Sequence, residues 1–162
     1  MTLYLLDASV LISAHEDYYP VDRIPPFWAW LIDMGERGMI KMPRPIFDEI
    51  RPPPGPLADW IKRSDVREAL ILKEPIDGAL VRQVLSRGYA PDLDDVEVEE
   101  IGKDPFLIAA ALTAIDRIVV TREVSKPSST RANRRIPDVC TGFGIQCITD
   151  FRLYSLLKFS IP

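Results

Sequence analysis

Residues 3–9, Leu-Tyr-Leu-Leu-Asp-Ala-Ser, form an apolar run that ends in a carboxylate, Asp7. A short apolar run of this kind is typical of a strand buried inside a parallel sheet. In open α/β sheets, ligands bind at the carboxyl ends of the strands, where Asp7 is expected to lie. Residues 118–121, Ile-Val-Val-Thr, repeat the pattern and lead through Arg122 to Glu123. Two strands that deliver acids to one edge of a sheet suggest a site for a divalent metal ion.

Strands and helices are predicted to alternate along the rest of the chain. Strands are expected at 2–7, 39–42, 118–121 and 146–148. Helices are expected at 9–14, 27–37, 45–51, 57–64, 75–87, 106–115, 137–143 and 150–159. The acidic stretch 92–100 is predicted to be a solvated connection. The alternation predicts a three-layer α/β/α fold with a central parallel sheet, and residues 1–162 are expected to form a single domain.

The composition indicates a globular protein, since 47% of the 162 residues are hydrophobic and 27% are charged. A net charge of −4 argues against binding nucleic acid through bulk positive charge, but it permits a local basic patch. The apolar runs are too short to span a bilayer, and no signal peptide opens the chain, so we expect a cytoplasmic protein. Cys140 and Cys147 are expected to be reduced, since nothing in the sequence suggests export. They are not expected to bind zinc, because two ligands cannot close a zinc site.

Four acids are candidates for metal binding and catalysis: Asp7, Glu49, Asp104 and Glu123. Each also has a plain structural explanation. Asp7 would close a turn, Asp104 before Pro105 would cap a helix, and Glu49 would be a surface acid at the edge of the apolar face of helix 45–51. Together, carboxylates without a counter-charge raise one another's pKa values. Such a cluster calls for Mg²⁺ or Mn²⁺, hard cations that take oxygen ligands.

Three polar residues are predicted to support these acids. Ser9 would either cap the first helix or hold Asp7 in position, and Thr121 is placed to orient Glu123. Asp138 is either a fifth participant or a favourable charge near the start of a helix. No serine–histidine or cysteine–histidine nucleophile competes with the metal hypothesis, since the chain has one histidine, near the end of the first helix.

The loop after Glu123 is basic. Its cations are Arg122, Lys126, Arg131, Arg134 and Arg135. Such a loop is either a flexible solvated segment or a phosphate-binding segment beside the metal site. In the second case these residues would position RNA without recognising its sequence.

At these residues the chain resembles a PIN domain, a metal-dependent nuclease fold. The matching segments, in the family's order, are Leu-Leu-Asp7-Ala-Ser9, Phe-Asp-Glu49-Ile, Lys-Asp104-Pro-Phe-Leu-Ile-Ala-Ala-Ala and Val-Val-Thr-Arg-Glu123. The resemblance spans residues 3–150 and implies a parallel sheet flanked by helices, with a Mg²⁺ or Mn²⁺ site built from these acids. It also implies RNA as the substrate. Many small members are toxins of type II toxin–antitoxin modules, often homodimers held inactive by an antitoxin protein.

The sequence departs from the family pattern at the fourth acid. The family commonly has an aspartate where Glu123 stands, followed by a shorter loop. Either Glu123 or Asp138 therefore completes the predicted site.

The expected function is a divalent-metal-dependent endoribonuclease that hydrolyses RNA phosphodiesters, as the toxin of a toxin–antitoxin pair would. One alternative is a catalytically silent PIN-like module that acts only through its partner. A less favoured alternative is a phosphatase of the haloacid-dehalogenase kind with Asp7 as covalent nucleophile. That family needs a second aspartate two positions further on, where this chain has Ser9.

Overall fold

The computed structural model describes all residues, 1–162, and contains one five-stranded sheet. The strands are β1 (Leu3–Leu6), β2 (Ile40–Pro43), β3 (Ile71–Leu72), β4 (Arg117–Val120) and β5 (Cys147–Ile148). Their order in the sheet is β3-β2-β1-β4-β5, and every neighbouring pair is parallel. The predicted parallel sheet is therefore confirmed, with β1 at its centre.

Ten α-helices and three further helical segments connect and cover the strands. The α-helices are α1 (Ala8–Ser13), α2 (Pro25–Glu36), α3 (Arg44–Phe47), α4 (Pro56–Lys62), α5 (Ser64–Leu70), α6 (Gly78–Gln83), α7 (Asp95–Ile101), α8 (Asp104–Leu112), α9 (Ile136–Gly142) and α10 (Asp150–Leu156). The further segments are the π-helical η1 (Ala14–Tyr18) and η2 (Val84–Tyr89) and the 3-10 helix η3 (Arg131–Asn133). None of these helices has the length and apolar character needed to cross a membrane.

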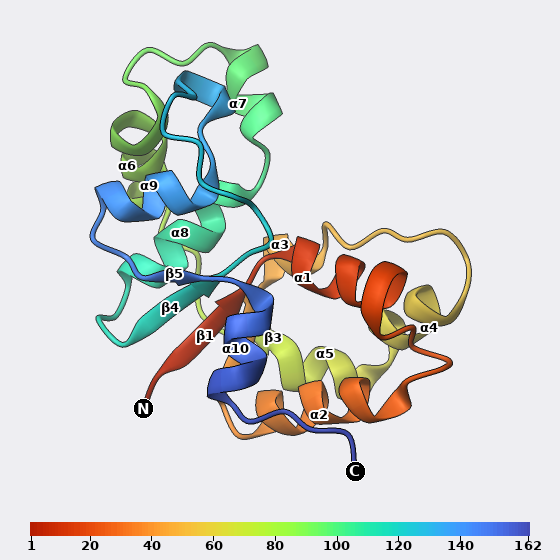
Figure 1. Cartoon of the computed structure of the whole chain (residues 1–162). Helices are drawn as coiled ribbons and strands as arrows, with labels where there is room; N and C mark the ends of the chain where they lie inside the picture. Colours follow the sequence, from red (N-terminus) through yellow and green to blue (C-terminus); the bar gives the residue numbers. More distant parts are fainter.

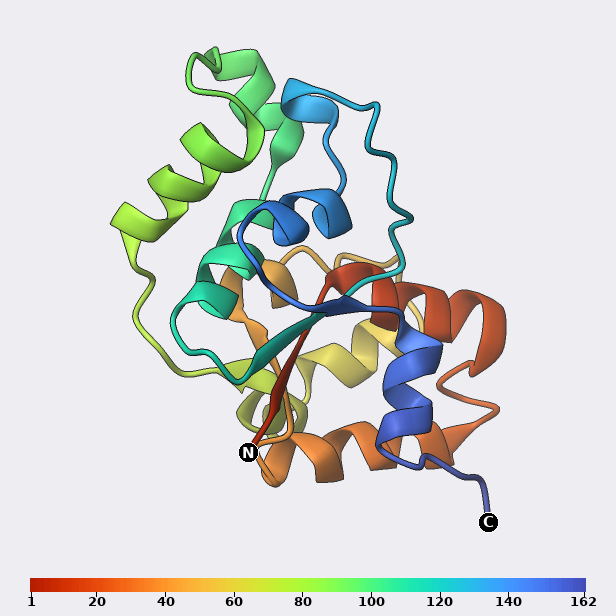
Figure 2. The same cartoon turned by 60° about the vertical axis from the view of Figure 1, so that its left-hand side comes forward.

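The helices form a layer on each face of the sheet. Figures 1 and 2 show α6, α8 and α9 on one face and α1, α2, α5 and α10 on the other. This arrangement is the predicted three-layer α/β/α fold. Because a parallel sheet needs both faces covered, its central strand β1 is apolar along its whole length, as residues 3–6 show.

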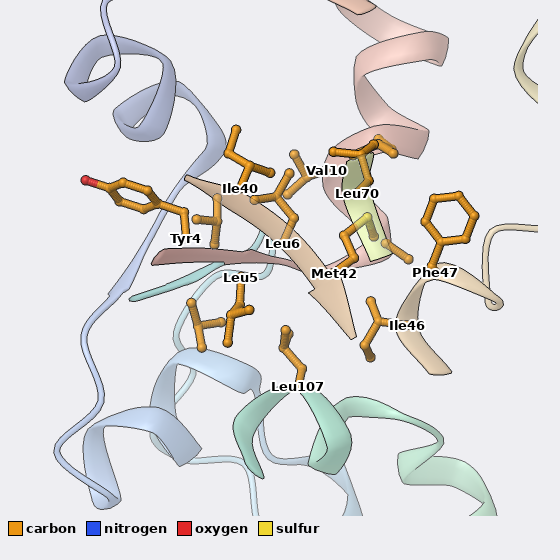
Figure 3. Close-up of a cluster of buried hydrophobic side chains, with 14 of the residues drawn as sticks. Tyr4, Leu5, Leu6, Val10, Ile40, Met42, Ile46, Phe47, Leu70 and Leu107 are labelled. Carbon is orange, nitrogen blue, oxygen red and sulfur yellow. The ribbon is translucent and has the colours of Figure 1, made fainter. Parts of the chain in front are cut away.

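The side chains of β1 alternate between the two layers. Leu5 points toward Leu107 of α8, whereas Tyr4 and Leu6 point to the opposite face (Figure 3). Leu5, Leu6 and Leu107 are completely buried. Helix α8 is apolar on nearly all sides, which suits a helix packed between the sheet and other helices.

The register of the sheet brings two site segments together. Leu6 pairs with Val120, so Asp7 and Thr121 are adjacent where β1 and β4 end. The backbone N–H of Asp7 donates to the carbonyl of Val120 at 2.9 Å. The predicted meeting of the two strand ends at one edge of the sheet is thus confirmed.

Three predictions of secondary structure were wrong. Residues 64–72 form α5 and β3, although neither element was expected. Helix α5 packs against α2, where Gly35 lets α2 approach the backbone of Ala69 closely. The stretch 92–100 is not a plain connection, since α7 begins there with a capping box between Asp94 and Glu97.

The predicted helix 45–51 is much shorter than expected. Helix α3 ends at Phe47, and the N–H groups of Glu49 and Ile50 bond to carbonyls three residues back, as in a tight terminal turn. The prolines from Pro52 onward prevent the helix from continuing. Glu49 consequently lies in a turn beyond the helix rather than on a helix face.

Candidate functional site

Asp7 is held in place by two hydroxyl groups. Its Oδ2 accepts a hydrogen bond from Ser9 Oγ at 2.7 Å and another from Thr121 Oγ1 at 2.9 Å. The side chain does not cap α1, and its Oδ1 accepts no hydrogen bond. Of the two roles considered for Ser9, the structure shows the one in which it holds Asp7. Asp7 is only 8% exposed, so one free carboxylate oxygen is fixed at the edge of the sheet.

Glu123 is positioned by the chain on both of its sides. Its backbone N–H donates to Thr121 Oγ1 at 3.1 Å, so Thr121 contacts the main chain of Glu123 and not its carboxylate. Its Oε2 accepts a bond from the backbone N–H of Ile136 at 2.7 Å, at the start of α9. Burial raises the pKa of Glu123, the bond from Ile136 opposes this, and the negative charge of Asp7 adds to the rise.

Asp104 is the first residue of α8, and its side chain makes no capping hydrogen bond. The expectation that it caps the helix was therefore wrong, because Lys103 occupies the capping position. Burial, together with the charges of Asp7, Glu123 and Glu49, raises the pKa of Asp104 to about 8. A carboxyl group with this pKa is destabilised whenever it ionises in the folded protein.

Glu49, in the turn after α3, belongs to the same group of acids. Its pKa is raised by desolvation and then by the charge of Asp7, while Lys103 lowers it. Since the charge of Asp7 acts on Glu49, Asp104 and Glu123, the structure brings all of these predicted site acids into one electrostatic cluster.

The four clustered acids, Asp7, Glu49, Asp104 and Glu123, lack a cationic partner. None of the four forms an ion pair. By contrast, Glu74 pairs with Arg117, and Asp92 pairs with Arg131 at 2.8 Å. The pKa values of Glu74 and Asp92 are lowered by those partners, whereas three of the clustered acids have raised values.

The fit of a metal ion can be judged from the donors. The cluster consists of carboxylate oxygens alone, which suits Mg²⁺ or Mn²⁺ rather than Zn²⁺. In the present side-chain arrangement, no three of the acids are close enough to form a ready-made metal site. The cluster therefore has the chemistry of such a site, and the side chains would have to draw together around the ion.

Asp138 belongs to the basic loop rather than to the cluster. Its carboxylate accepts hydrogen bonds from Ser125 Oγ and from the backbone N–H of Lys126. These bonds and the nearby arginines lower its pKa. Of the two candidates for the last acid, Glu123 is the one whose charge acts on Asp104.

Three cations of the basic loop are already engaged within the protein. Arg122 forms an ion pair with the buried Asp150 at 3.0 Å, and Arg131 bonds to Asp92 and Glu97. Arg134 donates to the carbonyls of Gly88 and Asp138. We therefore assign these arginines to anchoring the loop, although the sequence suggested that all of them bind phosphate.

The remaining cations, Lys126 and Arg135, make no side-chain hydrogen bond or ion pair. Both line a cleft of about 610 Å³ that also contains Asp104 and Glu123. Tyr89 lines the same cleft, and its buried hydroxyl has no hydrogen-bond partner. Tyr89 was not among the predicted site residues, because nothing in the residues around it indicates an unpaired hydroxyl group.

Comparison with known proteins places the chain in a family. Residues 4–161 match the family model described as a domain of unknown function, DUF4411, and the chain belongs to that family. No curated protein and no solved structure matches it. The matched region runs from β1 to beyond α10 and includes all of the clustered acids.

Proposed function

We propose that this protein is a divalent-metal-dependent endoribonuclease with a PIN-like fold. The main support is the acidic cluster of Asp7, Glu49, Asp104 and Glu123, which has no ion-pair partner and in which burial and the charge of Asp7 raise the pKa values of Glu49, Asp104 and Glu123. Burying such a cluster costs free energy, and a cation would offset that cost. The cluster also lies at the carboxyl edge of a parallel sheet, the usual location of ligands in this architecture.

Each site residue would have a distinct role in RNA hydrolysis. Asp7, Glu49, Asp104 and Glu123 would hold Mg²⁺ or Mn²⁺. The bound cation would supply positive charge opposite the oxygens of the phosphodiester and would activate the attacking water. Ser9 and Thr121 fix Asp7 so that its free oxygen is presented in one direction.

The cleft beside the acids supports RNA as the substrate. Lys126 and Arg135 line it together with Asp104 and Glu123, so phosphate-binding groups lie next to the proposed catalytic groups. Contacts of this kind position a strand without recognising its sequence. We also propose that the protein acts in the cytoplasm. Dimerisation and control by an antitoxin protein remain predictions from the resemblance.

Metal removal tests the proposal directly. Purified full-length protein is expected to cleave single-stranded RNA with Mn²⁺ or Mg²⁺ and to lose cleavage with excess EDTA, because the acids then have no cation to hold. Cleavage is measured on end-labelled RNA, and restoring Mn²⁺ should restore it. Equal cleavage with Mn²⁺ and EDTA would contradict the proposal. An absence of cleavage together with an absence of Mn²⁺ binding in calorimetry would favour a silent binding module.

Salt dependence tests the role of the free cations. Replacing Lys126 and Arg135 together by alanine is expected to weaken RNA binding and to reduce the slope of log K against log salt by about 1.4, since each contact to a single strand contributes about 0.7. Fluorescence anisotropy in EDTA keeps the RNA intact. The matched control replaces Arg23 and Arg152, which are exposed and form no ion pair, and should leave the slope unchanged. Equal slopes for the cleft variant and the wild type would exclude these contacts.

A further inference from the structure

A second hollow lies on the far side of α8 from the acidic cleft. This cavity, of about 310 Å³, is bounded by α8 and by the segment 73–77, which leaves β3 and runs up beside α8 to α6 (Figure 2). Its apolar walls include Phe106 and Ala110 of α8 and Ile76 of the facing segment. It shares no lining residue with the cleft that contains Asp104. The cavity is therefore a separate feature.

Most charges around the cavity are neutralised within the protein. Glu74 forms an ion pair with Arg117, and Lys73 forms one with Glu68. Asp77 caps α6, accepting from the backbone N–H groups of Ala79 and Leu80. The walls consequently offer a new ligand mainly apolar contact.

Arg44 is the exception, since its guanidinium makes no hydrogen bond and no ion pair. It lines the cavity and also a neighbouring groove that contains Glu49. Ile76 is shared in the same way, and 54% of its surface is exposed although it is apolar. The cavity thus opens toward one of the clustered acids, with a free cation at the junction.

Lys103 lies between the groove and the aromatic ring of the cavity. Its Nζ lies 5.3 Å from the centroid of the Phe106 ring, and the residue lines the groove beside Glu49. Arg44 and Lys103 therefore place positive charge next to an aromatic ring. A ligand that suits this arrangement has an anionic group attached to a flat, mostly apolar body.

We propose that the cavity binds one nucleotide of a single-stranded RNA. The base would lie against Phe106 and cover Ile76, while its phosphate would meet Arg44 and Lys103. Base stacking on an aromatic side chain and phosphate contact with cations are the usual elements of single-strand recognition. Pockets that bind small molecules start at roughly 300 Å³, so the cavity is large enough for a single base. The inference rests on the proposed function, because it places this nucleotide beside Glu49.

Mononucleotide binding tests the inference on the full-length protein in EDTA. The probes are AMP, CMP, GMP and UMP, with ribose 5-phosphate as the probe that lacks a base, and calorimetry gives each affinity. At least one nucleotide is expected to bind about tenfold more tightly than ribose 5-phosphate, because only the nucleotide can stack. Equal affinities would overturn the inference, since they would show phosphate binding alone.

Variants locate the binding. Ala110→Leu would fill the cavity and Arg44→Ala would remove its free cation, and each is expected to weaken nucleotide binding about tenfold or more. The matched controls are Ala29→Leu on α2 and Arg152→Ala on α10, both at exposed positions, which should bind as the wild type does. Circular dichroism verifies folding. Should Ala110→Leu not fold, Phe106→Leu tests the same cavity by removing the stacking surface.

The outcomes separate this inference from the nuclease proposal. One outcome is a protein that never cleaves RNA but binds nucleotides, with binding weakened in the cavity variants. That outcome would support the nucleotide-binding inference and contradict the nuclease proposal. The other outcome is metal-dependent cleavage with nucleotide binding that is unchanged in Ala110→Leu and Arg44→Ala. That outcome would contradict the nucleotide-binding inference and leave the nuclease proposal intact.

Discussion

Replacing Asp7 by asparagine is expected to lower the rate of RNA cleavage by about 10³-fold while leaving the protein folded. Asparagine has nearly the same size, and its side-chain oxygen can still accept the bonds that Ser9 and Thr121 donate to Asp7. What it loses is the negative charge that the proposed cation needs. A 10³-fold loss corresponds to about 4 kcal/mol of transition-state stabilisation, which is in the range for a disrupted metal centre.

The measurement compares single-turnover cleavage of labelled RNA by the variant and the wild type with saturating Mn²⁺. The matched control is Asp22→Asn, because Asp22 is exposed and has no side-chain partner. The control should cleave at the wild-type rate. Cleavage by Asp7→Asn within a few-fold of the wild type would show that Asp7 is a turn residue and not part of a catalytic site.

The second large effect is expected in the stability of the metal-free protein, which should fall as the pH rises. The pKa of Asp104 is about 8 in the folded protein, against 3.8 for an ordinary aspartate. Between these values the folded state binds more protons than the unfolded state, so raising the pH favours unfolding. The raised pKa values of Glu49 and Glu123 act in the same direction.

We expect a loss of about 4 kcal/mol between about pH 5 and pH 9, since a shift of one pKa unit is worth about 1.4 kcal/mol, or a fall of about 8–16 °C in Tm. Asp104→Asn should remove most of this slope, because asparagine does not ionise. Adding Mn²⁺ near pH 8 should restore the Tm of the wild type, since the ion binds the folded state alone. Thermal unfolding followed by circular dichroism in EDTA measures the slope, with Asp22→Asn as the control that retains it. A wild-type Tm independent of pH, or a slope unchanged in Asp104→Asn, would show that the folded protein does not raise the pKa of Asp104.

The sequence by itself determined the central strands of the sheet and the acids that follow them. The apolar runs 3–6 and 118–120 could only be buried strands, and the carboxylates that follow them had to lie at their carboxyl ends. The strongly apolar helix after Asp104 was equally clear. These features depend on hydrophobic runs and on local chain order, which are visible without knowing any distant contact.

The short elements could not be assigned in the same way. Strand β3 and helix α5 lie in residues 64–72, which contain no glycine or proline to mark where one element ends and the next begins. Helix α7 was missed for a different reason, since its capping signal of Asp94 and Glu97 was present but was outweighed by the high density of acids.

Only the tertiary structure decided what each polar side chain does. Arg131 and Arg135 look alike in the sequence, yet Arg131 is bound to Asp92 and Glu97, and Arg135 lines the cleft beside Glu123. The sequence also does not show whether Ser9 caps a helix or holds Asp7. It does not show that the guanidinium of Arg44 is free at the cavity. Ion pairs and cavities arise between residues that are far apart in the chain. Local sequence therefore specified which acids reach the edge of the sheet, and packing determined which of them and which cations were left without partners.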